Sequence, residues 1–260
     1  MKNVKLGERF WIWGHPKNSC QSYVDQPLDM SVTPAESARY FGVKNVYYVP
    51  FGHEMDMNDY GKDQLDINKT GMSIDNWGIP GANPIEYTFN LIPLLPNLNR
   101  LVCDDFFNGK CDHIPTWGDF TVTQLTEFRE RIHSIGLEMW VVLYEGQLGM
   151  PIDAYLDVFD GISFWFWSEP TVESYQKCIK AFFEKTPGKR RLIGCYLYNF
   201  GARRQASAEM VRYQLDNNKK FIEQGELEGV ILHNNNFGGL NFAAYEEAKK
   251  WMDEHGNEVI

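Results

Sequence analysis

Short apolar runs alternate with amphipathic helical patterns along the chain. The runs occupy residues 10–16, 43–52, 99–107, 137–146, 161–170, 190–201 and 229–239. Helices are predicted to begin at Thr33 and Pro34, near residue 85, at Thr121 or Thr123, at Thr171, at Ser207 and near residue 242, because Ser and Thr are good N-caps and proline suits the first helical turn. Strands that alternate with helices are typical of βα units with a parallel sheet.

The expected fold is one TIM-type (β/α)8 barrel over residues 1–260, with seven clear strands and an incomplete eighth unit. The segment from Asn257 to Ile260 is short and terminal, which leaves open a seven-stranded barrel, an incompletely closed one, or one completed by a segment not recognised as a strand. A polar segment at about 53–84, rich in Asp, Asn and Gly, is interpreted as a long loop with a functional role. An open doubly wound sheet is the alternative, but no GxGxxG turn follows the first strand and no P-loop pattern occurs.

Composition excludes some classes of partner. Hydrophobic residues make up 43% of the 260 residues and charged residues 23%, which is enough apolar material for a sizeable core. The 25 Lys and Arg against 35 Asp and Glu give a net charge of -10. Such a chain repels polyanions, so we expect no nucleic-acid partner. The oligomeric state does not follow from composition.

Cysteine usage and hydropathy indicate a reducing compartment. The five cysteines form no CxxC pair and leave one over, so a disulfide framework is not expected. The first residues lack an apolar run as long as a signal peptide, and no segment approaches the length of a membrane span. We therefore expect a cytoplasmic protein with no membrane partner, although a chain whose signal peptide has been removed would look the same.

Polar side chains cluster at the carboxyl ends of the predicted strands. They are His15, His53, Glu54, Asp104, Asp105, Glu145, Ser168, Glu169, Tyr198, Asn199 and the run from His233 to Asn236. In a barrel these ends converge on one face, where active sites form. Turn chemistry alone can explain the asparagines. A carboxylate directly after an apolar strand is costly unless it is paired, hydrated or put to use, so the acids indicate function.

Paired carboxyls at one rim predict a glycoside hydrolase. Two carboxyls on adjacent strand ends can stand about 5 to 9 Å apart, the range in which glycosidases place an acid with a base or nucleophile. Glu145 and Asp105 are the expected acid/base pair, and Asp104 or Glu169 tunes or replaces one of them. If the strand before them continues, Asp104 and Asp105 point to opposite faces. No cofactor is required, and no metal site is assigned.

Aromatic and polar side chains at the same rim suit a carbohydrate substrate. Aromatic residues reach 15% of the chain, and several follow strands, where flat rings can stack on sugar faces. Trp165 and Trp167 are the expected platforms, with core packing as the other explanation for Trp165. Hydrogen bonds to sugar hydroxyls are assigned to His15, His53, Tyr198, Asn199, His233 and Asn235.

The order of these motifs resembles a known group of proteins. CDDFF, LYEG, WFW and YLYNFG follow one another at strand ends, as in glycoside-hydrolase-like (β/α) barrels of bacterial polysaccharide-degrading systems. The resemblance covers most of the chain, and its motifs are short. It implies acids after the fourth and seventh strands. Glu145 fits the fourth of the strands identified above, but the seventh ends in HNNN without an acid, which favours Asp104, Asp105 or Glu169 as the partner.

Two other functions fit the same residues. A metal-dependent sugar isomerase or hydrolase would take ligands from His53, Glu54, Asp105, Glu145, Glu169 and His233, although neither HExxH nor an HxH after the first strand occurs. A non-catalytic carbohydrate-binding protein would need only the aromatic platforms and asparagines on the same fold.

Overall fold

The computed structural model describes residues 4–53, 56, 67–74, 84–95, 97–107 and 120–260. Eight parallel strands close into a barrel, in the order β1-β10-β7-β6-β5-β4-β3-β2. The strands are β1 (Phe10–Gly14), β2 (Asn45–Tyr48), β3 (Lys69–Ile74), β4 (Leu98–Cys103), β5 (Glu138–Tyr144), β6 (Gly161–Trp165), β7 (Arg190–Tyr196) and β10 (Gly229–His233). The expected TIM-type barrel is confirmed, and it is complete. A separate two-stranded sheet pairs β8 (Tyr198–Asn199) with β9 (Arg204–Gln205).

The eighth strand lies inside the segment that the sequence pattern assigned to a loop. β3 pairs with β2 and β4, whereas the terminal segment forms only an isolated antiparallel bridge between Val259 and Lys5. The strand signal is weak because β3 contains Gly71. A Cβ at Gly71 would stand 2.4 Å from the ring of Tyr47, so packing inside the barrel requires glycine at this position. The same glycine weakens the strand pattern in the sequence. Asp104 and Asp105 therefore follow the fourth barrel strand, and Glu145 follows the fifth.

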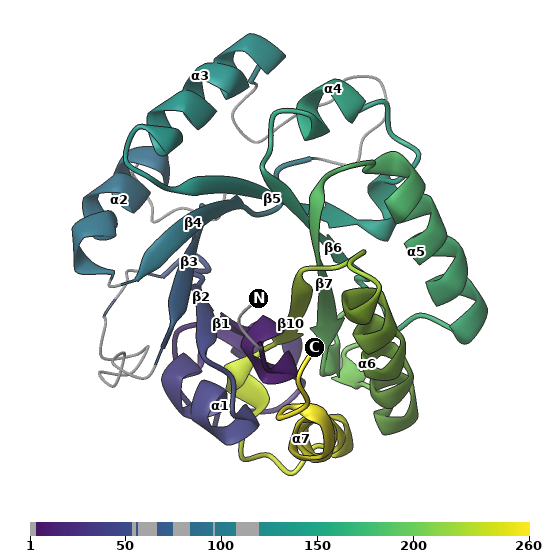
Figure 1. Cartoon of the computed structure of the whole chain (residues 1–260). Helices are drawn as coiled ribbons and strands as arrows, with labels where there is room; N and C mark the ends of the chain where they lie inside the picture. Colours follow the sequence, from purple (N-terminus) through teal and green to yellow (C-terminus); the bar gives the residue numbers. More distant parts are fainter. Residues whose placement is uncertain (1–3, 54–55, 57–66, 75–83, 96, 108–119) are drawn as a thin grey trace.

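Helices surround the barrel on the outside (Figure 1). They are α1 (Pro34–Phe41), α2 (Pro84–Leu91), α3 (Val122–His133), α4 (Asp153–Leu156), α5 (Val172–Lys185), α6 (Ala208–Glu223) and α7 (Ala243–His255). Thr33, Thr121, Thr171 and Ser207 cap four of them as the sequence predicts. None of the helices in the described ranges is long and apolar enough to cross a membrane.

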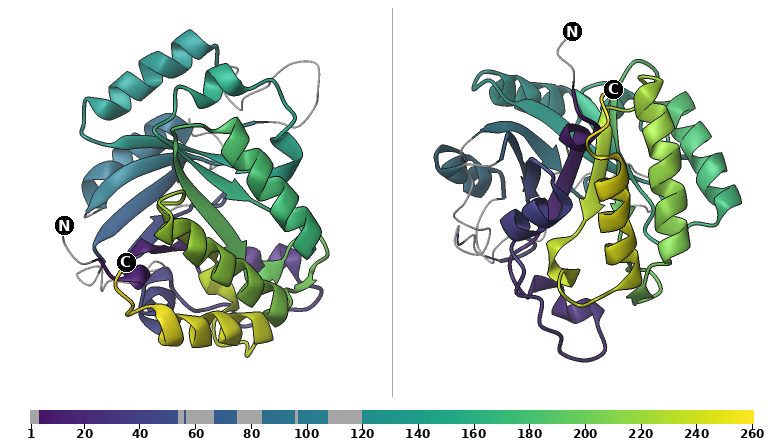
Figure 2. Two further views of the ribbon diagram at one scale, coloured as in Figure 1. Left: turned by 45° about the vertical axis from the view of Figure 1, so that its right-hand side comes forward. Right: turned by 60° about the horizontal axis from the view of Figure 1, so that its bottom comes forward.

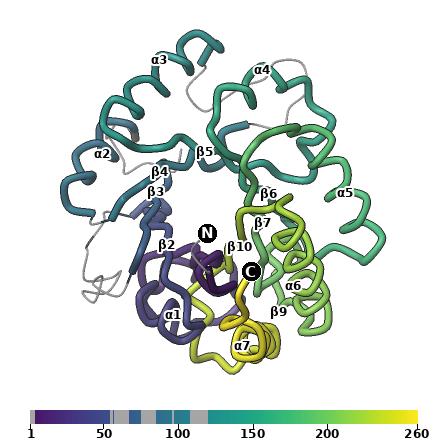
Figure 3. The backbone as a smooth tube through the Cα atoms, in the orientation of Figure 1, coloured from purple at the N-terminus to yellow at the C-terminus, as the bar shows by residue number. Residues whose placement is uncertain are grey.

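The two ends of the chain meet at the amino-terminal end of the barrel. The 3₁₀ turn Leu6–Arg9 leads into β1, and the backbone N–H groups of Leu6 and Gly7 donate to the carbonyls of Glu258 and Gly256. The side views show the carboxyl terminus beside the segment that leads into β1 (Figure 2). The chain path brings α7 beside α1, which completes the ring of helices (Figure 3).

The inside of the barrel is filled by large side chains that alternate along the strands. This inner cluster consists of Trp11, Trp13, Tyr47, Val49, Val102, Trp140, Val142, Trp165, Leu192 and Ile231. Glycines on neighbouring strands make room for the tryptophans: a Cβ at Gly194 would lie 1.9 Å from the Trp165 ring, and one at Gly161 would lie 2.5 Å from Trp140. The interior is therefore packed up to the layer formed by Trp13 and Trp165.

An ionic cluster around the buried Arg100 closes the amino-terminal end of the barrel. The Arg100 side chain is 0% exposed, and its Nη2 stands 3.0 Å from Glu228 Oε1 and 3.4 Å from Glu138 Oε2. Arg190 bridges the same two glutamates at 2.5 and 2.6 Å. The Arg100 guanidinium also lies 4.6 Å from the Trp11 ring centre and 4.2 Å from that of Trp140. Each buried charge thus has an opposite charge or a ring face beside it.

Glu228→Gln tests this cluster. Removing one partner of a buried ion pair leaves the other charge uncompensated, so we expect a loss of about 2 to 4 kcal/mol in the free energy of unfolding at neutral pH. Burial alone would raise the pKa of Glu228, but Arg190 and Arg100 together lower it. A lowered carboxyl pKa stabilises the fold above the unfolded value of about 4.3 and ceases to do so as the pH falls through the folded value.

The difference between wild type and Glu228→Gln should therefore shrink below about pH 4 in urea unfolding monitored by circular dichroism. The control is Glu184→Gln, whose exposed carboxylate pairs with Lys180 in α5 and should change stability by less than about 0.5 kcal/mol. Equal effects of the two variants would contradict a structural role for the cluster.

Candidate active site

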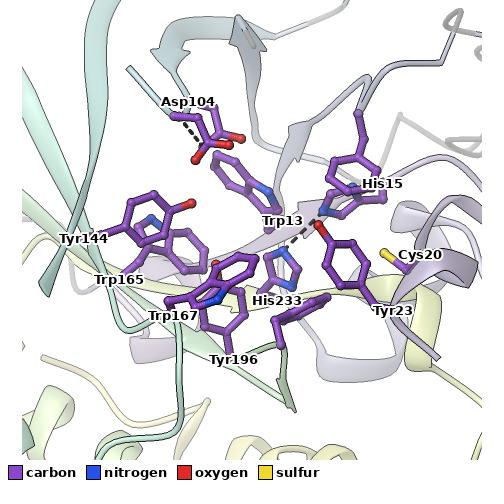
Figure 4. A pocket seen from close by; sticks show the side chains of 13 residues that line it. Trp13, His15, Cys20, Tyr23, Asp104, Tyr144, Trp165, Trp167, Tyr196 and His233 are labelled. Atoms are coloured by element: carbon purple, nitrogen blue, oxygen red, sulfur yellow. Dashed lines mark hydrogen bonds between the residues drawn. The ribbon is translucent and has the colours of Figure 1, made fainter. Parts of the chain in front are cut away.

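A pocket opens at the carboxyl ends of the barrel strands, directly above the inner tryptophans. Its cavity volume is about 90 Å³, which is room for several water molecules or part of a ligand. It is lined by 13 side chains: Trp13, His15, Cys20, Tyr23, Phe51, Asp104, Asp105, Tyr144, Trp165, Trp167, Tyr196, Phe200 and His233 (Figure 4). The carboxyl-terminal face is where barrel enzymes place their chemistry.

Strand alternation decides which residues reach this pocket. In β5, Trp140 and Val142 fill the barrel interior, and Tyr144, two residues later, lines the pocket. β5 ends at Tyr144, and the next residue, Glu145, begins a 3₁₀ turn and is not among the lining residues. The same period of two leads from Trp13 to His15, from Val49 to Phe51, from Val102 to Asp104 and from Trp165 to Trp167.

Asp104 and Asp105 both line the pocket. β4 ends at Cys103, and the two aspartates form a turn in which Asp105 has a left-handed φ of 48°. The Asp105 backbone N–H donates to Asp104 Oδ1 at 3.0 Å. The opposite orientations expected for a continuing strand do not occur, because the strand stops before the first aspartate. The turn thus holds two carboxyl groups at the pocket wall.

Two tyrosines line the pocket close to the carboxyl groups. The charges of Asp104 and Asp105 act on the phenols of both Tyr144 and Tyr196. Burial, with the nearby negative charges, raises the pKa of both phenols well above the ordinary value. Both therefore remain protonated donors at neutral pH.

His15 and His233 form a buried neutral pair on the far wall from the aspartates (Figure 4). Their Nε2 atoms stand 3.3 Å apart, and neither Nδ1 has a hydrogen-bond partner among the described residues. Burial, with a smaller contribution from His53, lowers the pKa of His15 to about 3. Burial and the charge on His15 lower that of His233 well below its ordinary value. Because both rings are neutral, one Nε2–H donates to the other Nε2.

The asparagine run after β10 holds the β1 loop in place. Asn235 Oδ1 accepts from the His15 backbone N–H at 2.8 Å, and its Nδ2 donates to the carbonyls of His15 at 3.0 Å and Val32 at 2.7 Å. Asn236 Nδ2 donates to the Pro16 carbonyl, and Asn234 Nδ2 contacts Cys20 Sγ at 3.3 Å. Asn235 is thus buried, committed to backbone groups and absent from the pocket lining, so its expected contact with sugar is not supported.

The acids expected to partner the aspartates bind backbone groups next to the pocket. Glu145 accepts from the Trp167 backbone N–H at 3.2 and 3.1 Å through its two oxygens. Glu169 accepts from the Ser207 backbone N–H at 2.8 Å, at the amino end of α6. Neither lines the pocket. Each carboxylate instead satisfies a backbone N–H at a point where the chain turns.

Three further candidates also lie outside the lining. His53 is exposed at the rim, and its link to the pocket is its electrostatic effect on His15. Tyr198 is buried against Phe237 and donates its phenol proton to the Tyr23 carbonyl at 3.0 Å. Asn199 is buried and accepts from the Ala202 backbone N–H. His15, Trp165, Trp167, His233 and the two aspartates are the candidates that the fold brings together.

Seven lining residues have no role in the sequence-based hypothesis: Trp13, Cys20, Tyr23, Phe51, Tyr144, Tyr196 and Phe200. The period of two along β5 and β7 could have identified Tyr144 and Tyr196 as inward-facing. Tyr23 and Phe200 lie in connecting segments and carry no such signal. The Cys20 thiol is buried, which raises its pKa to about 12 and keeps it protonated.

The metal-dependent alternative lacks a donor set in the described part of the chain. No three His, Cys, Asp or Glu side chains among those residues are grouped so that they could hold a metal ion. Of its proposed ligands, Asp105 and His233 line the pocket, Glu145 and Glu169 bind backbone N–H groups, and Glu54 lies outside the described residues.

Comparison with known proteins identifies the fold. No family model and no curated protein sequence matches the chain. Among solved structures, a GH18 chitinase from Cycas revoluta, crystallised with (GlcNAc)4, is similar with a TM-score of 0.55 and 11% identity, covering 93% of this chain and 98% of that one. A probable 2-pyrone-4,6-dicarboxylic acid hydrolase from Acinetobacter baumannii has a TM-score of 0.55 and 12% identity, covering 94% and 91%.

The α-subunit of tryptophan synthase from Pyrococcus furiosus, in a mutant form, is similar to nearly the same degree. Its TM-score is 0.54 at 12% identity, covering 96% of this chain and 97% of that one. The fold is thus shared with glycoside hydrolases and with enzymes of other chemistry. Function must be argued from the pocket, because the barrel supports many reactions.

Asn235→Ala tests the clamp that shapes the pocket. The substitution removes three hydrogen bonds and leaves buried backbone groups of His15 and Val32 unpaired, so we expect a loss of about 2 to 4 kcal/mol in unfolding free energy. Asn257→Ala is the control, because the exposed Asn257 side chain accepts one hydrogen bond from Lys5, and its loss should cost less than about 0.5 kcal/mol. Urea unfolding measures both. A loss no larger than that of the control would show that the clamp contributes little.

Proposed function

We propose that the protein is a glycoside hydrolase in which Asp104 and Asp105 supply the two carboxyl groups. The observation that carries this proposal is their position: both line an aromatic pocket at the carboxyl-terminal rim of the barrel. The resemblance to barrels of bacterial polysaccharide-degrading systems supports a carbohydrate substrate, and Glu145 is replaced as a catalytic candidate by the second aspartate.

A carboxyl pair can hydrolyse a glycosidic bond in two ways. One carboxyl protonates the leaving oxygen, while the other either takes a proton from the attacking water or attacks the anomeric carbon itself and is later released by water. Here the Asp105 backbone N–H fixes the orientation of Asp104. A carboxyl group held by a donor from the protein favours a defined geometry at the reacting bond.

The remaining walls suit a sugar. The Trp167 side chain is 43% exposed at the pocket mouth, so one face of its ring is available for stacking. Trp165 forms part of the floor, and its Nε1–H is already used by Ser163 Oγ at 3.2 Å. His15 and His233 are neutral, and their Nδ1 atoms are left for hydrogen bonds to hydroxyl groups.

Asp104→Asn and Asp105→Asn test the assignment. Loss of a general acid or base typically costs 10²- to 10⁴-fold, so each variant should lower kcat/KM by at least about 100-fold on a substrate found by screening aryl glycosides and defined oligosaccharides. Both substitutions keep the local backbone, because Asn retains an acceptor at position 104 and tolerates the left-handed φ at position 105.

Glu145→Gln is the matched control. Glutamine keeps an oxygen that can accept from the Trp167 N–H, so kcat/KM should stay within about threefold of wild type. Full activity in either aspartate variant, or a collapse in Glu145→Gln with the fold intact, would refute the assignment. Sugar binding without turnover by the wild-type protein would instead indicate a carbohydrate-binding protein.

A further inference from the structure

We propose that Tyr23 is a substrate-binding residue whose phenol O–H donates a hydrogen bond to one hydroxyl group of the sugar in the pocket. This inference rests on the proposed function for the nature of the ligand and adds a specific contact from the loop after β1. It follows from the position of the phenol, from its protonation and from the hydrogen bonds that hold the loop.

The Tyr23 ring forms part of the pocket wall. Tyr23 ends the 3₁₀ turn Ser19–Tyr23, and its side chain is one of the lining residues. Its ring centroid lies 4.9 Å from that of Phe200, 6.1 Å from that of Phe51 and 6.5 Å from that of Trp167, which also line the pocket. The close-up shows the phenol oxygen directed from the ring into the space between these walls (Figure 4). The polar end of Tyr23 therefore faces the cavity.

The phenol stands across the cavity from the carboxyl groups. Figure 4 shows Tyr23 and Asp104 on opposite sides of the same space. Burial is the largest cause that raises the pKa of the Tyr23 phenol, and the charges of Asp105 and Asp104 add to it. A phenol with a raised pKa keeps its proton at neutral pH. Tyr23 thus presents a neutral O–H donor to a ligand that lies between it and the aspartates.

This donor is available to a ligand. The Tyr23 phenol makes no hydrogen bond with any residue in the described part of the chain, whereas the Tyr23 backbone carbonyl accepts one. Other polar groups of the lining already have protein partners: Trp165 Nε1 donates to Ser163, and His15 is joined to His233. A sugar hydroxyl at hydrogen-bond distance satisfies the phenol in place of solvent.

The hairpin after β7 holds Tyr23 in this position. The Tyr198 phenol, in β8, donates to the Tyr23 carbonyl at 3.0 Å, and Arg203 Nη2 donates to the neighbouring Ser22 carbonyl at 2.6 Å. The Phe200 ring, between these two residues in the chain, stands at 86° to the Tyr23 ring. A side chain that is held before the ligand arrives loses less conformational entropy on binding. Tyr198 is therefore a positioning residue for Tyr23.

Tyr23→Phe tests the contact, because it removes the hydroxyl and keeps the ring. Glucose, galactose, mannose and xylose are titrated into the wild-type protein, and the fluorescence of the tryptophans that line the pocket reports binding. For the sugar that binds most tightly, Tyr23→Phe should weaken binding about 5- to 10-fold, as expected for one lost hydrogen bond. Tyr213→Phe is the matched control, because its hydroxyl accepts from Gln176 on the outer helices, and it should bind within about twofold of wild type.

Deoxy sugars separate a direct contact from a change in the fold. Each monodeoxy derivative of the chosen sugar lacks one hydroxyl. Loss of the hydroxyl that accepts from Tyr23 should weaken binding to the wild type by about 5- to 10-fold, and binding to Tyr23→Phe by less than about twofold. The other derivatives should lose the same factor in both proteins. A purely structural role of Tyr23 would instead weaken every derivative equally.

Tyr198→Phe tests the positioning. Removal of its donor should weaken binding of the same sugar about two- to fivefold in the wild-type background. In the Tyr23→Phe background the same substitution should change binding by less than about 1.5-fold, because Tyr198 acts through Tyr23. Additive effects of the two substitutions would contradict this link.

The outcomes separate this contact from the proposed hydrolysis. Sugar binding that depends on Tyr23 and on one hydroxyl, without turnover of any glycoside, would support the contact and refute catalysis. Turnover of a glycoside with unchanged kcat and KM in Tyr23→Phe would do the reverse. Unchanged sugar binding in Tyr23→Phe, a loss that is coupled to no single hydroxyl, or no binding of any of the four sugars to the wild type overturns the proposal.

Discussion

In a closed barrel of parallel strands, successive side chains point alternately to the axis and to the surrounding helices, and every strand delivers its carboxyl end to one rim. The residues that continue the inward-facing positions beyond the packed interior line the pocket. In β5, Trp140 and Val142 fill the barrel, and Tyr144 lines the pocket above them. β5 ends there, and the next residue, Glu145, begins a 3₁₀ turn in which its carboxylate binds a backbone N–H while Tyr144 faces the pocket.

Charged side chains have different surroundings at the two ends of the barrel. At the amino-terminal end, Arg100 is fully buried but lies among glutamates and tryptophan faces, so its charge is compensated within the protein. At the carboxyl-terminal end, Asp104 and Asp105 stand at the wall of the pocket, where the Asp105 backbone N–H donates to Asp104 Oδ1. Charge compensation inside the fold favours stability, whereas carboxyl groups at a pocket wall favour chemistry.

Pocket shape depends on residues that never touch the cavity. Asn235 ties the His15 backbone to the segment at Val32, and the neighbouring asparagines hold Pro16 and Cys20. The Tyr198 phenol donates a hydrogen bond to the carbonyl of Tyr23, whose side chain lines the pocket. Polar residues after strands therefore either bind backbone groups of neighbouring loops or line the pocket. The sequence does not distinguish the two roles, because a backbone group and a sugar hydroxyl require the same donors and acceptors.

The sequence by itself determined the alternation of strands and helices, the helix caps and the class of barrel, because periodicity and capping are local properties of the chain. It also brought Asp104 and Asp105 to the rim. Only the tertiary structure decided that β3 completes the barrel, since Gly71 is there to accommodate the distant Tyr47 ring. It also separated the pocket residues from Glu145, Glu169 and Asn235, because the partner of a polar side chain is set by contacts across strands and loops that are remote in sequence.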